Sequence, residues 1–352
     1  MQIKKINKFI IIMDKNFRLP GLDIVRSLAI LFVITGHFFL NTDFFKSSYS
    51  GVNLFIQSVC LTLFGVAVPL FLLLTGYLNS NKQLSVKYYK SISRIIFAYL
   101  IYAFITILYR IYFRGEYFPA SVWIQLILSY KVIPYGWYIE MYLCLFVLIP
   151  FLNIIYRGLK NWQEKCCLIV TFLVLTAAPP LFNRTGFHII PEQFVDMYPI
   201  TFYFIGAYIH EYKFKFSKLK LSLILMLLCL LEPAVNLLFR NDGIYSSFLG
   251  GRDSFYYILM SVIVFLLFYD VDFKSKLIKK ISLLSLDMYL CSWVFDNLYY
   301  TYFKAHYFET QPQFFAFFLI IVPLVFFSSF GVAWLREKIN WGVKRILVKQ
   351  SI

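Results

Sequence analysis

The sequence predicts an all-α membrane protein with about ten transmembrane helices. Three observations support this fold class. Hydrophobic residues make up 60% of the 352 residues and charged residues only 15%, whereas globular chains carry about 25% charged residues. The mean hydropathy is +0.70. Apolar runs of helical, bilayer-spanning length recur along the chain, and open sheets are excluded in lipid because their edge groups would have no hydrogen-bond partner.

Ten spans follow from these runs, and most of the Lys and Arg residues lie in the short segments between the spans or at the ends of the chain. Their ranges in chain order are 22–40, 58–78, 94–113, 136–156, 166–182, 198–211, 219–239, 254–271, 281–303 and 313–335. The sixth is short and rich in aromatic residues. The stretch 118–133 is apolar but too short to cross, since a helix rises only about 1.5 Å per residue. We expect it to lie in the interface or to dip into the membrane and return.

The distribution of positive charge orients these spans. If the N-terminus is inside, the inner segments hold 25 Lys and Arg and the outer segments hold 8, with Arg26 within the first span. Cytoplasmic loops of membrane proteins carry such an excess. The count therefore predicts a multi-pass protein of the cell (plasma) membrane with both termini cytoplasmic. It also accounts for the net charge of +16 without nucleic acid as a partner.

The chain divides into three parts by this pattern. Residues 1–21 are expected to form a short basic segment at the inner membrane face, 22–335 a single ten-helix domain, and 336–352 a basic cytoplasmic tail. The first residues do not resemble a cleavable signal peptide, because their apolar run is only four or five residues long and no small-residue cleavage site follows. The six cysteines show neither a disulfide framework nor metal-ligand spacing, and we expect no bound metal.

Two polar residues interrupt the first apolar run, LDIVRSLAILFVITGHFFL. Arg26 and His37 are 11 residues apart, which on a helix leaves them about 20° from eclipsed and roughly 16 Å apart along the axis. A charge in the middle of a span costs roughly 2.5–3.5 kcal/mol on insertion scales. Asp23 lies three residues before Arg26, at pairing distance on the same side. The structural alternative is that Arg26 extends towards the inner face while His37 binds a neighbouring helix.

These residue types suit proton transfer close to an anionic ligand. Histidine can be neutral at cytoplasmic pH and can take a proton from a hydroxyl. Arginine stays charged and binds phosphate or carboxylate through a rigid fork. An anionic ligand that enters from the cytoplasm, with chemistry deeper in the membrane, would use both residues.

The same run, with an Arg, ten residues and a His, resembles the opening of the acyltransferase-3 family of bacterial membrane O-acyltransferases. Four later segments are similar to the family in the same order. They are GYLNSNKQLSVKYYKSISRIIFAYL with Arg94, GWYIEMYLCLFVLIPFL from Trp137 to Pro150, YPITFYFIGAYI with Gly206, and SLLSLDMYLCSWVF with Ser285 and Tyr289. The similarity covers nearly the whole chain.

The chain also departs from the family pattern at two places. Ser292 stands where many members have a His, two residues after the Tyr-Leu pair. The paired acids that follow the Trp in members with a fused esterase-like domain are missing, because Glu140 comes only three residues after Trp137. Glu140 is a functional candidate by the cost of an intramembrane acid alone. The pattern is closer to the stand-alone polysaccharide and lipopolysaccharide acyltransferases.

The resemblance implies a membrane O-acyltransferase. It would move an acyl group, expected to be acetyl, from cytoplasmic acyl-CoA to a hydroxyl of a cell-surface glycan or of its lipid-linked precursor. Acetyl-CoA would be a co-substrate, and no bound cofactor is expected. A succinyl or longer acyl group, and a covalent acyl-enzyme, stay open. His37 is expected to act as general base or acyl relay. Arg26 and Arg94 are expected to bind the donor, and Asp23 to orient Arg26. Acceptor contacts are expected from Trp137, Tyr138 and Glu140.

Two other classes of function are considered. Intramembrane charges also mark transport pathways, so a transporter or flippase for glycans or lipid-linked sugars is the main alternative. Neither repeat symmetry between the halves nor a matched pair of broken spans supports it. A structural subunit of a polysaccharide-synthesis complex is the third possibility. Asp287 and Asp296 lie nine residues apart in the ninth span, on faces about 180° from each other, so they cannot both line one narrow site.

Overall fold

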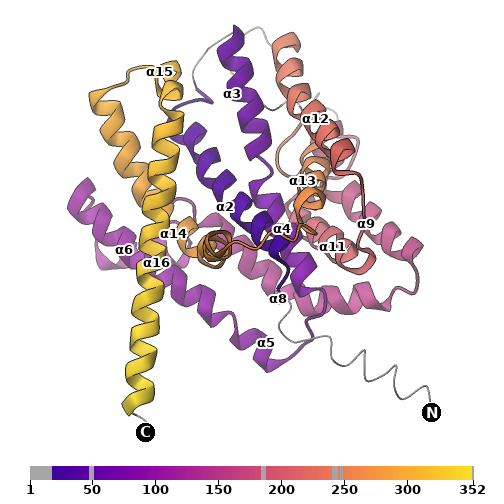
Figure 1. Cartoon of the computed structure of the whole chain (residues 1–352), viewed down its shortest axis with the longest axis horizontal. Helices are drawn as coiled ribbons and strands as arrows, with labels where there is room; N and C mark the ends of the chain where they lie inside the picture. Colours follow the sequence, from indigo (N-terminus) through magenta and orange to yellow (C-terminus); the bar gives the residue numbers. More distant parts are fainter. Residues whose placement is uncertain are drawn as a thin grey trace.

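The structure is a computed structural model that describes residues 18–46, 51–183, 188–239, 245, 247 and 249–350. These residues form helices and connecting loops without any β-strand (Figure 1). The longer helices are α2 (Pro20–Asn41), α3 (Gly51–Phe64), α4 (Ala67–Asn79), α6 (Ser93–Arg114), α8 (Trp137–Gly158), α9 (Trp162–Thr176), α11 (Tyr198–Tyr212), α12 (Lys218–Phe239), α13 (Phe255–Phe268), α14 (Lys276–His306) and α16 (Phe318–Gln350). The short ones are α5 (Val86–Lys90), α7 (Ala120–Leu128), α10 (Pro179–Phe182), η1 (Val195–Met197) and α15 (Gln311–Ala316).

Each of the ten predicted ranges falls largely on one helix or on two consecutive helices. Among the described residues, five helical stretches are long and apolar enough to cross a membrane: Pro20–Asn41, Gly51–Asn79, Val86–Arg114, Trp137–Gly158 and Phe318–Asn340. The all-helical membrane character is therefore confirmed. The count of ten spans and the side on which the termini lie stay predictions.

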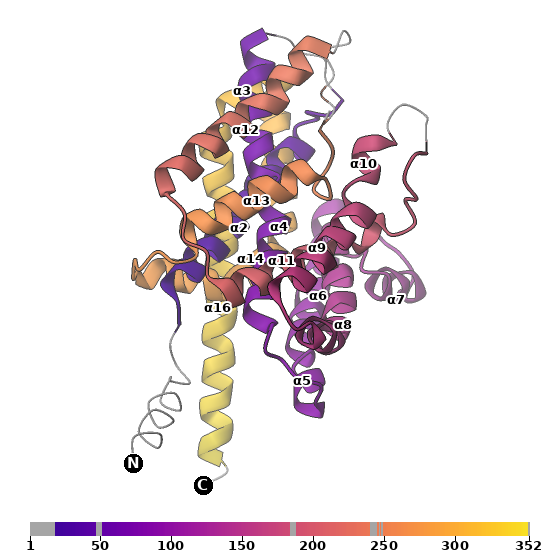
Figure 2. The same cartoon turned by 90° about the vertical axis from the view of Figure 1, so that its right-hand side faces the viewer.

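The division of the chain into three parts stays a prediction. Helix α16 continues without a break from Phe318 to Gln350 and so passes through the predicted boundary at residue 335. The predicted segment 1–21 falls mostly outside the described residues. The short stretch 118–133 contains the nine-residue helix α7, which is too short to cross a bilayer. Figure 2 places α5 and the C-terminal end of α16 at the same end of the molecule, and both belong to segments predicted to be cytoplasmic.

Helix α2 occupies the middle of the bundle and packs against α4, α14 and α16 (Figure 1). Pro20 stands in its first turn, where the missing N–H has no intrahelical partner to lose. At its other end Thr42 Oγ1 donates to the carbonyl of Phe38, and Asn41 Nδ2 donates to the carbonyl of His37. These bonds satisfy carbonyl groups that the end of the helix leaves open, so His37 lies in a well-ordered last turn.

Helices α2 and α14 lie side by side and run in the same direction. Ser282 Oγ donates to Asp23 Oδ1 at 2.6 Å near their N-terminal ends, and His37 Nδ1 lies 3.4 Å from Asp296 Oδ2 further along both helices. The two contacts are separated by the same number of residues on each helix. A parallel course is what the predicted topology requires of its first and ninth spans. Helix α14 therefore presents one continuous face to the residues of α2.

Helices α4 and α11 cross with their backbones in contact. A Cβ atom added to Gly206 would lie 2.2 Å from the carbonyl oxygen of Leu73, and one added to Gly76 would lie 2.0 Å from that of Tyr203. Only glycine allows this approach, as at other close helix crossings in membranes. The crossing fixes α4, which carries several residues of the cavity described below.

The loop after α6 is held by an ion cluster. Glu116 accepts hydrogen bonds from Arg110 Nε at 2.7 Å and from Arg114 Nε at 2.6 Å, and the Arg110 guanidinium lies over the ring of Trp123. Burial opposes ionisation of Glu116, but the hydrogen bonds from the two arginines outweigh it and lower the pKa of this carboxyl below its usual value. The cluster ties the end of α6 to α7.

Candidate functional site

A cavity of about 290 Å³ lies between α2, α4, α6, α8 and α14. Its lining is mostly apolar, with hydroxyl groups from Tyr138, Tyr142, Ser285 and Tyr289 and one charged side chain, Arg26. Largely apolar pockets with a few converging polar groups are typical of ligand sites. The cavity is therefore the first candidate for substrate binding.

Among the described residues, Arg26 has no counterion at this cavity. The predicted contact in which Asp23 orients Arg26 is not formed, because the Asp23 carboxylate accepts hydrogen bonds from Arg18 Nε at 2.7 Å and from Ser282 Oγ at 2.6 Å instead. Within the described part of the chain the Arg26 guanidinium makes neither a hydrogen bond nor an ion pair. A half-buried cation of this kind is costly and is suited to bind an anionic ligand.

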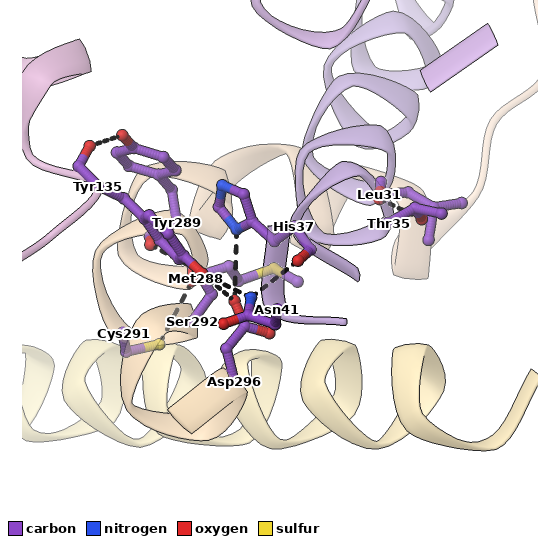
Figure 3. A network of polar contacts seen from close by, with 10 residues as sticks. All are labelled: Leu31, Thr35, His37, Asn41, Tyr135, Met288, Tyr289, Cys291, Ser292 and Asp296. Atoms are coloured by element: carbon purple, nitrogen blue, oxygen red, sulfur yellow. Dashed lines mark hydrogen bonds and ion pairs between the residues drawn. The ribbon is translucent and has the colours of Figure 1, made fainter. Parts of the chain in front are cut away.

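His37 lies beside a fully buried carboxylate. Its Nδ1 is 3.4 Å from Asp296 Oδ2, and Asp296 is 0% exposed. The imidazole ring stacks on the ring of Tyr135 with centroids 3.7 Å apart. Figure 3 shows the other ring nitrogen pointing away from Asp296. When Nδ1 carries its proton towards the carboxylate, Nε2 is left as the basic nitrogen.

Tyr135 and Asn41 complete this cluster. The Tyr135 hydroxyl donates to Asp296 Oδ2 at 2.9 Å, and Asn41 Nδ2 donates to the Tyr135 hydroxyl at 2.9 Å (Figure 3). The hydrogen bonds keep the carboxylate and the aromatic ring in place around His37. A carboxylate in this position stabilises the charged form of the imidazole.

The cavity and the histidine cluster share a wall. Tyr289 lines the cavity, and its hydroxyl donates to the backbone carbonyl of Tyr135, the residue that stacks on His37. Tyr138, one turn further into α8, contacts Tyr289 with ring centroids 5.5 Å apart. The two sites are therefore neighbours, joined through the first residues of α8 and the middle of α14.

The remaining predicted residues are only partly brought together. Tyr138 lines the cavity, whereas Arg94 and Glu140 are exposed and do not belong to its lining. Trp137 lies under the guanidinium of Arg252, which is 4.0 Å from the ring centroid. The structure therefore keeps Arg26, His37 and Tyr138 near one site and leaves Arg94 and Glu140 outside it.

The two intramembrane aspartates have different partners, as their opposite faces predict. Asp287 forms an ion pair with Arg336 of α16 at 2.7 Å, whereas Asp296 faces His37 of α2. Sequence reasoning missed that Asp296 is the partner of His37, and it missed Asn41 and Arg18 entirely. The sequence did mark Asp296 as a candidate, because a carboxylate within an apolar helix is costly and is usually functional or paired.

Comparison with protein families gives one result that covers this whole arrangement. A family model of the acyltransferase-3 type, described as an acyltransferase domain, matches residues 19–335. Comparisons with curated proteins and with solved structures found no match. The matched range begins just before α2 and ends within α16, so it includes Arg26, His37 and Asp296. The chain belongs to the acyltransferase-3 family of membrane acyltransferases.

Proposed function

We propose that the chain transfers an acetyl group from cytoplasmic acetyl-CoA to a hydroxyl of a cell-surface glycan or of its lipid-linked precursor in the cell membrane. Membership of the family supports acyl transfer. The observation that carries the assignment of the site is the contact of His37 with the buried Asp296, directly beside a cavity that contains the unpaired Arg26.

The spacing on α2 constrains how a donor would lie. Arg26 and His37 are about 16 Å apart along the helix axis, so they cannot contact the same atom of a ligand. An acyl-CoA would have to bind in an extended form, with an anionic part at Arg26 and its thioester at His37. The guanidinium fork suits the phosphate oxygens of such a donor. Arg94 lies outside the cavity, next to the lining residue Ile95, and would act only on the part of the donor that protrudes.

The chemical step follows from the position of His37. Nε2 takes the proton of the acceptor hydroxyl, and the acceptor oxygen attacks the thioester carbonyl carbon. The C–S bond then breaks, and the CoA thiolate takes the proton from the imidazolium. Asp296 stabilises that imidazolium through its negative charge. A relay through an acylated His37 would use the same nitrogen.

The test measures CoA release from acetyl-CoA by the purified protein, together with the O-acetyl content of the surface glycan by NMR. His37→Ala should lower the rate by about 10²- to 10⁴-fold, the usual contribution of a general base. His306→Ala, at the exposed end of α14, is the control and should retain the rate. A His37→Ala protein with the wild-type rate would remove the catalytic assignment.

Donor binding is tested separately through Arg26→Lys. A lysine keeps the charge but cannot reproduce the two parallel hydrogen bonds of the fork, so the KM for acetyl-CoA should rise about tenfold. Unchanged donor affinity would contradict the role of Arg26. If wild-type protein neither hydrolyses acetyl-CoA nor transfers its acyl group, the transporter or flippase alternative is favoured.

A further inference from the structure

Arg252 lies over an aromatic ring, and among the described residues it has no acidic partner. Its guanidinium carbon is 4.0 Å from the ring centroid of Trp137. It precedes α13 by three positions, and its side chain is exposed. In the portion of the chain that the structure describes, the guanidinium forms no hydrogen bond or ion pair. Within that portion its N–H groups have no partner and could bind a ligand.

The position of Trp137 connects this arginine to the site. The residues around the start of α8 direct three aromatic side chains to three places: Tyr135 stacks on His37, Tyr138 lines the cavity, and Trp137 lies under Arg252. The rings of Trp137 and Tyr138 are in edge-to-face contact. A group bound by Arg252 would thus be adjacent to both the cavity and the histidine cluster.

The contact between the guanidinium and the indole has two physical consequences. Contact with the indole orients the guanidinium and removes water from one of its faces, so less freedom is lost when a ligand binds its edge. That edge presents parallel N–H groups which match the two oxygens of a carboxylate or a phosphate. The same contact covers one face of Trp137, so a sugar ring could stack only on the other face. The pair of Arg252 and Trp137 is therefore better suited to bind an anionic group than to bind a sugar ring by stacking alone.

We propose that Arg252 and Trp137 bind the oxyanion of an acidic saccharide acceptor and so select acidic acceptors for this site. The oxyanion would be a sugar carboxylate or the phosphate of a lipid-linked precursor. In the predicted topology Arg252 is on the outer side, opposite to the side from which the donor enters. The role of the bound saccharide as an acceptor rests on the proposed acyltransferase function, whereas the binding of an acidic sugar does not.

Direct binding tests this proposal without turnover. Glucuronate and glucose 1-phosphate serve as the acidic probes and glucose as the neutral one, and their affinities for the purified full chain are measured by ligand-observed NMR in the absence of acyl-CoA. Wild-type protein should bind the acidic probes in preference to glucose. Arg252→Ala should weaken this binding about tenfold or more, and Arg252→Lys should weaken it less. Lys131→Ala, which removes another exposed cation from the segment before α8, should leave it unchanged.

The outcomes separate the two proposals. Acidic probes that bind no better than glucose, or equally well to wild-type and Arg252→Ala protein, would overturn the assignment of Arg252. Preference for glucose 1-phosphate over glucuronate would identify phosphate as the recognised group, and the reverse preference would identify a carboxylate. His37→Ala should bind the acidic probes as wild type does. If those probes require Arg252 but the wild-type protein transfers no acyl group, the proposed function fails while the anion site stands.

Discussion

The pair of His37 and Asp296 gives the sharpest prediction, through the substitution Asp296→Asn. The amide has nearly the shape of the carboxylate, and its oxygen can still accept the hydrogen bond from Tyr135 that Asp296 Oδ2 accepts at 2.9 Å. The substitution therefore removes the negative charge and little else. If Asp296 serves to stabilise the imidazolium of His37, this charge is what the reaction needs.

The size of the effect follows from the distance. Two unit charges 3.4 Å apart attract each other by about 5 kcal/mol at an effective dielectric constant of about 20. This figure is an upper bound, because the dipole of the amide and those of the surrounding groups still act on the imidazolium in the variant. Since about 1.4 kcal/mol corresponds to a tenfold change in rate, we expect kcat to fall by about 10²- to 10³-fold.

The assay is CoA release from saturating acetyl-CoA, normalised to the amount of monodisperse protein. Asp287→Asn is the matched control, since it changes a second buried carboxylate on the same helix that pairs with Arg336 rather than with His37. Breaking that pair should lower thermal stability, because a cation is left without its partner, but kcat per folded molecule should be retained. If Asp296→Asn kept the wild-type kcat, or if Asp287→Asn lost it to the same extent, the reasoning about His37 would be refuted.

Two further predictions concern stability. Gly206→Ala would place a Cβ atom 2.2 Å from the carbonyl oxygen of Leu73 and should lower the free energy of unfolding by about 1–3 kcal/mol, measured as a lower midpoint of thermal unfolding. Gly158→Ala is the control, because no atom lies within 4 Å of the added Cβ. Equal midpoints for the two variants would contradict the tight crossing of α4 and α11. The pKa of Glu116 is lowered in the folded protein, so its contribution to stability is complete above its ordinary pKa of about 4.3 and is lost as the pH falls through the lowered value. Glu116→Gln should therefore lower the unfolding midpoint at neutral pH but not in strong acid, and an equal difference at both would exclude the ionised pair as its source.

Helix positions could be predicted from the sequence because an apolar run of bilayer length has essentially one folded form. Periodicity within one helix is equally reliable. The nine-residue spacing of Asp287 and Asp296 places them on opposite faces, and the structure confirms this with partners on α16 and α2. Such statements need no knowledge of which helix lies next to which.

Contacts between helices were beyond this reasoning. Arg94 and Glu140 are exposed, whereas their neighbours Ile95 and Ile139 line the cavity. A shift of one residue turns a side chain by about 100° around the helix, so the identity of the cavity-facing residue depends on how each helix is rotated in the bundle. Neither composition nor motif spacing determines that rotation.

The partner of Asp23 shows a second limit. Three residues separate it from Arg26, and helical spacing alone favours that pair. Arg18, however, lies before Pro20 in the segment that leads into α2, and from there it reaches the Asp23 carboxylate. Residues that precede a helix follow no helical period, so spacing could not predict this contact. The outcome changes the chemistry, because within the described part of the chain it leaves Arg26 without an acidic partner and able to bind a ligand.

The parallel pair of α2 and α14 connects the two ends of the proposed site. Asp23 and His37 each contact α14, through Ser282 and Asp296, and the cavity-lining Tyr289 lies between these two contacts along α14. Sites built on packed helices hold their geometry more closely than sites on loops. The distance between Arg26 and His37 is thus fixed within one helix, and the partners on α14 are fixed relative to it. A displacement of α14 along α2 would separate His37 from Asp296 and reshape the cavity at the same time, so donor binding and proton transfer should respond together to any change at this helix pair.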